Sequence, residues 1–307
     1  MNQPASLTAC TGSETAADVA LLVLACRAPG TLEHLAQAFA DHRFRIHVHL
    51  DRKVDLAAYA AGRRWPENLR FIADRHEVFW GGFNMIRATE ALARDALRHP
   101  RTAACVLVSD DTLPLLSPGC IHAAITAQPD RIDVGLAKRN PPFLRRYTGW
   151  FFLDSPATSA RPLETQDRIV DVPTLDALRR LAQAQARGKY PLPEVWSGSQ
   201  WWSLGRPVLE AMLDDLARDA WLRESFEFAA VPDELVFQTL YANRLGLTAR
   251  SFTGPMLTDM TRTPAPFVFH SCEELPAIPA GKLFVRKVAD GAAAAVMRRL
   301  AGSWEVA

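Results

Sequence analysis

The chain has 307 residues, of which 49% are hydrophobic and 22% are charged, and its net charge is +1. This composition suits a large buried core and excludes a mostly disordered chain. The basic residues are scattered along the chain and form no runs, which argues against a nucleic-acid partner.

The N-terminal segment, residues 1–17, has neither the basic stretch nor the apolar stretch of a signal peptide, so we expect a flexible tail. The most apolar run begins at Val19 and breaks at Arg27, far short of the roughly 20 residues that span a bilayer. The five cysteines are odd in number and lack C-x-x-C spacing, which favours a reducing compartment and no structural zinc. We therefore expect a soluble protein without a transmembrane segment.

Strand-like and helix-like segments alternate through the first half of the chain. The predicted strands are residues 18–30, ending in a Pro-Gly loop, 44–51, 68–73, 102–111 and 131–137. The predicted helices are residues 31–42, 84–100 and 117–128, the last with Ser117 as its N-cap and Pro118 at its first position. This order predicts an α/β fold with a mostly parallel central sheet flanked by helices.

After about residue 140 the regular alternation stops. Residues 139–152 and 154–167 are rich in proline, arginine and aromatics, and we predict long loops there. Helices are predicted again at residues 172–187, 206–219 and 233–243. We expect one domain over residues 18–307, with its site on loops beyond the carboxyl ends of the strands.

The stretch "HVHLD" places His47, His49 and Asp51 on one face of a strand, because side chains alternate along a strand. A metal-dependent hydrolase built on His47, His49 and Asp110 is one hypothesis, although such a site needs three or four convergent ligands. Asp51, at the carboxyl end of the strand, is well placed to accept hydrogen bonds from a nucleotide base or ribose.

Asp110 and Asp111 directly follow a buried strand. Paired acids there can hold a divalent cation, although the spacing is not D-x-D. The alternative is that both acids are turn or N-cap residues.

In "VFWGGFNM", Trp80 and Phe83 flank two glycines, and Asn84 could cap the following helix. Glycine permits a positive φ and lets a ligand approach the backbone closely, whereas the alternative is a tight turn with core aromatics. The sequence lacks both G-x-G-x-x-G and G-x-x-x-x-G-K-[ST], which excludes a Rossmann dinucleotide site and a P-loop.

The stretch "WSGSQWWSLGR" packs three tryptophans around small polar residues. Indole faces with neighbouring serine and glutamine suit a sugar ring, so we expect a substrate wall; a core strand is the alternative.

In "PDELVFQTLY", Asp233 is a good N-cap, and Glu234, Gln238 and Tyr241 share one face of the predicted helix. The helix dipole favours an acid in the first turn whatever its role. The same dipole would keep Glu234 ionised, as a general base requires. Further along, Arg286 and Lys287 in "GKLFVRKV" could stabilise a diphosphate leaving group without a metal.

Taken in order, "HVHLD", "VFWGGFNMIRATEAL", "LVSDDTLPLLSP", "GSQWWSLGR", "PDELVFQTL" and "LFVRK" resemble the core-2/I-branching β-1,6-N-acetylglucosaminyltransferase and xylosyltransferase family, glycosyltransferase family 14. The resemblance covers roughly residues 18 to 290. It implies a GT-A-like fold, a UDP-sugar donor, inversion at the anomeric carbon and no need for a metal.

The resemblance also assigns roles to individual residues. It implies that Glu234 is the catalytic base, that Arg286 and Lys287 neutralise the diphosphate, and that Asp51 faces the uridine. It makes a metal at Asp110 and Asp111 less expected. The predicted site residues are Glu234 as the base; Asp51, Trp80, Gly81, Arg286 and Lys287 for the donor; and Gly198, Ser199, Gln200, Trp201, Trp202, Asp233, Arg145 and Arg146 for the substrate.

The function predicted in this way is transfer of a sugar, N-acetylglucosamine or xylose, from a UDP-sugar to a hydroxyl of a glycan or glycoconjugate, with no cofactor. The hydrolase and a non-catalytic glycan-binding module remain as alternatives. Animal and plant members of the family are typically membrane-anchored and disulfide-linked, and this chain shows neither feature. We therefore expect a bacterial, cytoplasmic member, or one peripheral at the inner face of the membrane, whose acceptor is not a mucin-type glycan.

Overall fold

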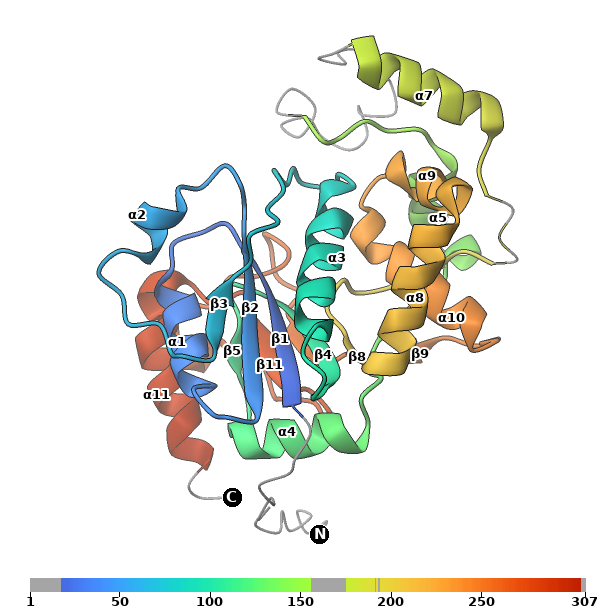
Figure 1. Ribbon diagram of the computed structural model, residues 1–307. Coiled ribbons are helices and arrows are strands. Elements are labelled where there is room, and N and C mark those ends of the chain that lie inside the picture. The colour runs from blue at the N-terminus through green and yellow to red at the C-terminus, as the bar shows by residue number, and fades with distance from the viewer. Residues whose placement is uncertain (1–17, 156–174, 191, 193, 305–307) are drawn as a thin grey trace.

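The computed structural model describes residues 18–155, 175–190, 192 and 194–304 (Figure 1). The predicted tail, residues 1–17, and most of the predicted loop at 154–167 lie outside these residues. The main sheet has the strand order β3-β2-β1-β4-β8. Its strands are β1 (Asp18–Ala25), β2 (Phe44–Leu50), β3 (Leu69–Phe71), β4 (Thr102–Ser109) and β8 (Ser203–Gly205). All neighbours are parallel except β8, which is antiparallel to β4, so the predicted mostly parallel sheet is confirmed.

Continuous apolar sequence explains why β1 and β4 lie at the centre of this sheet. Every residue of β1 is buried, as expected for a parallel strand that is covered on both faces. Helix α3 (Asn84–Leu97) packs on β1, β2 and β4, while α8 (Arg206–Arg218) packs on β4 and β8 (Figure 1). Helix α4 (Pro118–Ala127) contacts β1 and β4.

Two small three-stranded sheets complete the strand inventory of the described residues. One has the order β10-β11-β5, formed by β10 (Met256–Thr258), β11 (Phe284–Arg286) and β5 (Leu113–Pro114). The other has the order β7-β6-β9, formed by β7 (Trp196–Ser197), β6 (Asp133–Leu136) and β9 (Ser251–Phe252). The strand predicted at 131–137 therefore exists as β6, but it pairs antiparallel in a small sheet instead of extending the main one.

The remaining helices surround these sheets. Helix α1 (Gly30–Ala38) packs against α11 (Ala293–Trp304), as Figure 1 shows. The other helices and 3₁₀ turns are α2 (Leu56–Ala60), η1 (Ala137–Arg139), α5 (Pro141–Thr148), α7 (Leu175–Arg187), α9 (Ala220–Glu227), η3 (Pro232–Glu234), α10 (Val236–Arg244), η4 (Cys272–Glu274) and η5 (Asp290–Ala292). No helix in the described part of the chain is both long enough and apolar enough to cross a bilayer.

Of the two N-caps predicted for α4 and α3, the first is confirmed and the second is wrong. Ser117 caps α4 as predicted, accepting a hydrogen bond from the Cys120 N–H at 3.3 Å. The predicted N-cap at Asn84 is wrong, because Asn84 is already the first residue of α3. Its N–H donates instead to both carboxylate oxygens of Asp154, each at 3.1 Å. A residue 70 positions away therefore caps α3.

The prediction of a loop over residues 139–152 is wrong, because α5 occupies Pro141–Thr148. Pro141 and Pro142 stand in the first turn, where a missing N–H costs no helical hydrogen bond, so these prolines start the helix. The helix predicted over residues 233–243 is also shifted. It begins at Val236, after the 3₁₀ turn η3, so Asp233 is not an N-cap.

Candidate active site

The candidate site lies where the carboxyl ends of β1, β2, β4 and β11 meet, as predicted for an open α/β sheet. Cys26 and Arg27 follow β1, Asp51 follows β2, Asp110 and Asp111 follow β4, and Arg286 and Lys287 lie at the end of β11.

Asp110 is a buried carboxylate that accepts several hydrogen bonds in this region. Its Oδ2 accepts hydrogen bonds from the N–H groups of Cys26 and Arg27, each at 2.7 Å, and its Oδ1 accepts from the Arg27 guanidinium at 3.2 Å. Burial raises the pKa of Asp110, while the two N–H donors oppose that shift. The carboxylate thus holds the loop after β1 in place.

Arg286 is fixed by contacts on several sides. Its Nε donates to Ser109 Oγ at 2.9 Å and to Asp111 Oδ1 at 3.3 Å, and its guanidinium lies 4.3 Å from the centre of the Trp201 ring. Arg27 forms a second ion pair with Asp111, at 3.0 Å. Asp110 and Asp111 therefore both face guanidinium groups. These groups occupy the place where a metal ion bound to the two carboxylates would lie.

Lys287 differs from its neighbour Arg286. Its side chain is half-buried and, within the described residues, has no ion pair or hydrogen bond. Burial lowers its pKa, and the positive charges of Arg286 and Arg27 lower it further. Asp111 attracts this charge without forming a close ion pair, so the Lys287 ammonium can still turn to a ligand at the strand ends.

Arg27 is a site residue that the sequence analysis missed, since it was treated only as the end of an apolar run. Its position directly after a buried parallel strand was the available signal.

Asp51 is bound to its own loop. Its Oδ2 pairs with Lys53 Nζ at 2.7 Å, its Oδ1 accepts from the Lys53 N–H at 2.9 Å, and the Val78 N–H lies 3.3 Å from Oδ2. The carboxylate therefore orders the segment that leads to Trp80, whose side chain is 57% exposed.

The glycine pair after Trp80 connects this region with the residues before Glu234. The Gly81 carbonyl accepts a hydrogen bond from the Val231 N–H at 2.9 Å. Gly81 has φ +78°, which favours glycine, and a Cβ on Gly82 would lie 2.1 Å from Asp154 Oδ1 and would displace the carboxylate that caps α3. Val231 itself has φ 53° and ψ 54°, a costly left-handed conformation for a β-branched residue. Strained backbone of this kind is concentrated at functional sites.

Glu234 forms an ion pair with Arg146 of α5, with 2.6 Å between Arg146 Nη1 and Glu234 Oε2. Burial raises the pKa of Glu234, and the Arg146 charge and hydrogen bond lower it. Burial, and then the charge of Glu234, raise the pKa of neighbouring Asp233. Arg146 therefore favours the ionised form of Glu234. The predicted place of Glu234 in the first turn of a helix is wrong, because it precedes α10.

Residues 198–202 connect the two halves of the site. The Gly198 N–H donates to the Glu234 carbonyl at 3.0 Å, and the Gln238 amide donates to the Ser199 carbonyl at 2.7 Å. A Cβ on Gly198 would lie 1.7 Å from the Asp133 carbonyl oxygen, so only glycine fits there. Trp201, which lies on Arg286, is three residues further along, a span of at most about 11 Å.

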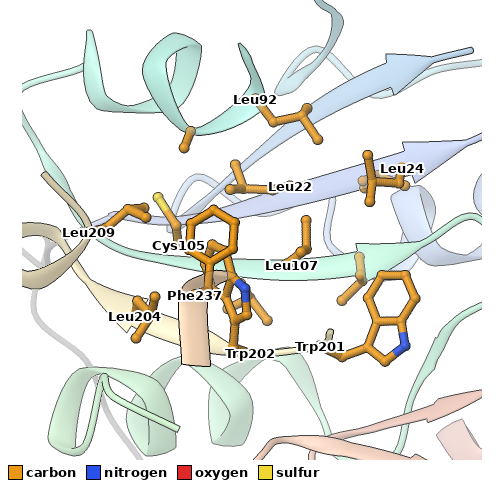
Figure 2. Close-up of a cluster of buried hydrophobic side chains, with 14 of the residues drawn as sticks. Leu22, Leu24, Leu92, Cys105, Leu107, Trp201, Trp202, Leu204, Leu209 and Phe237 are labelled. Atoms are coloured by element: carbon orange, nitrogen blue, oxygen red, sulfur yellow. The ribbon is translucent and has the colours of Figure 1, made fainter. Parts of the chain in front are cut away.

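The predicted sugar-facing wall of indoles is wrong for two of the three tryptophans. Trp196 and Trp202 are fully buried, and Trp202 packs 5.1 Å from the Phe237 ring. Figure 2 shows Trp202 among core residues and Trp201 at the end of the cluster. Trp201 is also buried, with 7% of its surface exposed, but it contacts the Arg286 guanidinium, whereas the alternative of a core strand holds for the other two.

The histidines of β2 do not form the centre of a hydrolase. His47 Nδ1 lies 2.7 Å from Asp95 Oδ2, and His49 Nε2 accepts from the His76 N–H at 2.9 Å. The Asp110 carboxylate accepts hydrogen bonds from two N–H groups of the loop after β1. Among the residues that the structure describes, no group of three or more His, Cys, Asp or Glu side chains could hold a metal ion.

The chain was compared with known proteins. The sequence model of one family, described as "Core-2/I-Branching enzyme", matches residues 19–261. No curated protein matches the chain. The matched range includes both Glu234 and residues 198–202, and it ends before Arg286.

Proposed function

Because the chain belongs to the Core-2/I-branching enzyme family and is therefore a glycosyltransferase, we propose that it transfers a sugar from a UDP-sugar with inversion and without a metal ion. The acceptor is a hydroxyl group of a glycan or glycoconjugate. The mixed α/β architecture, with a mostly parallel sheet flanked by helices, is consistent with the GT-A-like fold of such enzymes.

One observation carries this proposal. Residues 198–202 contact the backbone carbonyl of Glu234 at one end and, through Trp201, the Arg286 guanidinium next to Lys287 at the other. A general base and a diphosphate site joined through so short a segment suit in-line displacement at an anomeric carbon.

In the proposed reaction, the Glu234 carboxylate takes the proton of the acceptor hydroxyl as its oxygen attacks the anomeric carbon. The bond between that carbon and the β-phosphate oxygen breaks, and UDP leaves with the bonding electrons. Lys287 and the Arg286 guanidinium stabilise the charge that develops on the leaving diphosphate. A single displacement of this kind inverts the anomeric configuration.

The environment of Asp110 and Asp111 supports a reaction that needs no metal. Their oxygens already accept hydrogen bonds or ion pairs from Arg27, Arg286, Ser109 and two backbone N–H groups. A divalent cation would have to displace these partners and lie beside two fixed guanidinium charges.

Donor screening tests the proposed function. The purified protein should release UDP from UDP-N-acetylglucosamine or UDP-xylose in the presence of glycan acceptors, with excess EDTA present. The product formed from an α-linked donor should be β-linked. A retained α-linkage would contradict the role of Glu234 as a base in a single displacement.

The Arg146–Glu234 ion pair leads to a prediction about the pH dependence of turnover. Catalysis requires ionised Glu234, and Arg146 lowers the pKa of Glu234. In Arg146→Gln that pKa should rise, so the acid limb of the kcat profile should move to higher pH and the loss of rate should be largest at low pH.

A matched control for this variant is Arg187→Gln, which removes the similar Arg187–Glu224 ion pair between α7 and α9. Its pH profile should equal that of the wild type. An acid limb that stays in place in Arg146→Gln would show that Glu234 is not the titrating base.

A further inference from the structure

A polar cavity of about 310 Å³ lies toward the amino ends of the main strands, away from the candidate active site. It is bounded by β2, by β3 and by the last turn of α3. The lining includes Arg45, His47, Asn68, Arg70, Arg98 and His99.

Two buried carboxylates organise the cations around this cavity. Asp95 pairs with His47 Nδ1 at 2.7 Å, Arg70 at 2.8 Å and Arg98 at 3.4 Å. Asp18 pairs with Arg45 at 2.8 Å and Arg101 at 2.9 Å.

Positive charge is in excess here. Even when Glu67, the other acid of the lining, is included, the arginines around these two carboxylates outnumber the acids. Such an excess raises the local concentration of anions.

Polar atoms without partners gather in the same place. Within the described residues, His47 Nε2 and Asn68 Oδ1 are buried and have no hydrogen bond, whereas His99 Nδ1 lies 3.5 Å from Asp18 Oδ2. Buried polar atoms without partners are costly. A protonated His47 Nε2 can donate to an anion, whereas the Asn68 carbonyl oxygen can only accept. The guanidinium groups of Arg70 and Arg98 are mostly exposed and can turn toward a ligand.

We propose that this cavity binds a small phosphate-bearing solute. Guanidinium forks match the oxygens of a phosphate, and small-molecule pockets begin at about 300 Å³. None of the exposed large hydrophobic side chains of the described residues lines the cavity, which favours a free solute over a lipid headgroup. Arg45 and Asp51 lie at opposite ends of β2, roughly 20 Å apart, so this site is separate from the diphosphate cations.

Calorimetric titration with inorganic phosphate tests this proposal. The full chain is first saturated with UDP, so that phosphate cannot report on Lys287. Wild-type protein should bind phosphate, and Arg70→Gln/Arg98→Gln should bind it roughly tenfold more weakly or worse, because charge-assisted hydrogen bonds are lost. If UDP does not bind, phosphate is titrated into the Lys287→Gln variant instead. Phosphate binding to that variant cannot be due to Lys287, so the two sites remain distinguishable.

The matched control is Arg94→Gln/Arg218→Gln, which removes the same charge from exposed helix positions that do not line the cavity. Its phosphate affinity should equal that of the wild type. If the double variant of the cavity does not fold, Arg98→Gln alone serves, since its pair with Asp95 is the longest of the three.

Equal phosphate affinity in all variants, or no phosphate binding to the wild type, would overturn the proposal. Sedimentation with phosphatidylglycerol-containing vesicles separates the two sources of phosphate. Loss of vesicle binding in the cavity variant alone would support the same site, with the phosphate carried on a lipid.

Discussion

Replacing Glu234 by glutamine should reduce turnover by roughly 10²-fold or more, the range typical of removing a general base. Glutamine preserves the shape of the side chain and can still accept a hydrogen bond from Arg146. The Gly198 N–H bonds the backbone carbonyl of residue 234, so the connection to residues 198–202 is retained. UDP affinity should therefore stay at the wild-type value while kcat falls, which steady-state kinetics and calorimetry measure.

The control for this change is Glu224→Gln. Glu224 is 34% exposed and pairs with Arg187, whereas Glu234 is 33% exposed and pairs with Arg146. The two substitutions remove the same charge from similar surroundings, yet only the one at Glu234 should affect turnover. Near-wild-type kcat in Glu234→Gln would remove this residue from the mechanism.

Replacing Lys287 by glutamine should weaken UDP binding by roughly tenfold to a hundredfold, the value of a charge-assisted hydrogen bond to phosphate. Asp111 attracts Lys287 at a distance but keeps its ion pairs with Arg27 and Arg286, so the loss of Lys287 leaves no buried acid unpaired. The substitution should also lower kcat, because charge develops on the leaving diphosphate in the transition state. Calorimetry with UDP gives the first effect and donor kinetics the second.

Lys282→Gln is the matched control, since Lys282 precedes β11 and its ammonium group donates to the Gly254 carbonyl, away from the acids of the site. Its UDP affinity should be unchanged. Wild-type affinity in Lys287→Gln would mean that the diphosphate lies elsewhere.

The parallel sheet could be predicted because β1 and β4 are continuous apolar runs, and burial of both faces of a strand requires such sequence. Helix α5 could not be predicted in the same way. Proline and arginine marked its sequence as a loop, although two prolines at the start of a helix preserve its hydrogen bonds. Local composition does not distinguish these two outcomes.

The contacts that define the site were beyond sequence reasoning because they join distant positions. Arg146 and Glu234 lie 88 residues apart, and Asp154 caps a helix that begins 70 residues earlier. Motif order placed Glu234 and Lys287 in one site, but it gave no indication that Arg146 forms an ion pair with Glu234. Similarly, the tryptophan pattern did not separate Trp201, which touches Arg286, from Trp202, which belongs to the core.

Calorimetric titration of the protein with UDP, first in excess EDTA and then with Mn²⁺, would show whether protein cations alone hold the diphosphate. Equal affinity under both conditions is the outcome expected if the cations Arg27, Arg286 and Lys287 hold the diphosphate. Binding only with Mn²⁺ would contradict it and would assign Asp110 and Asp111 to a metal, while no binding under either condition would contradict UDP-sugar transfer.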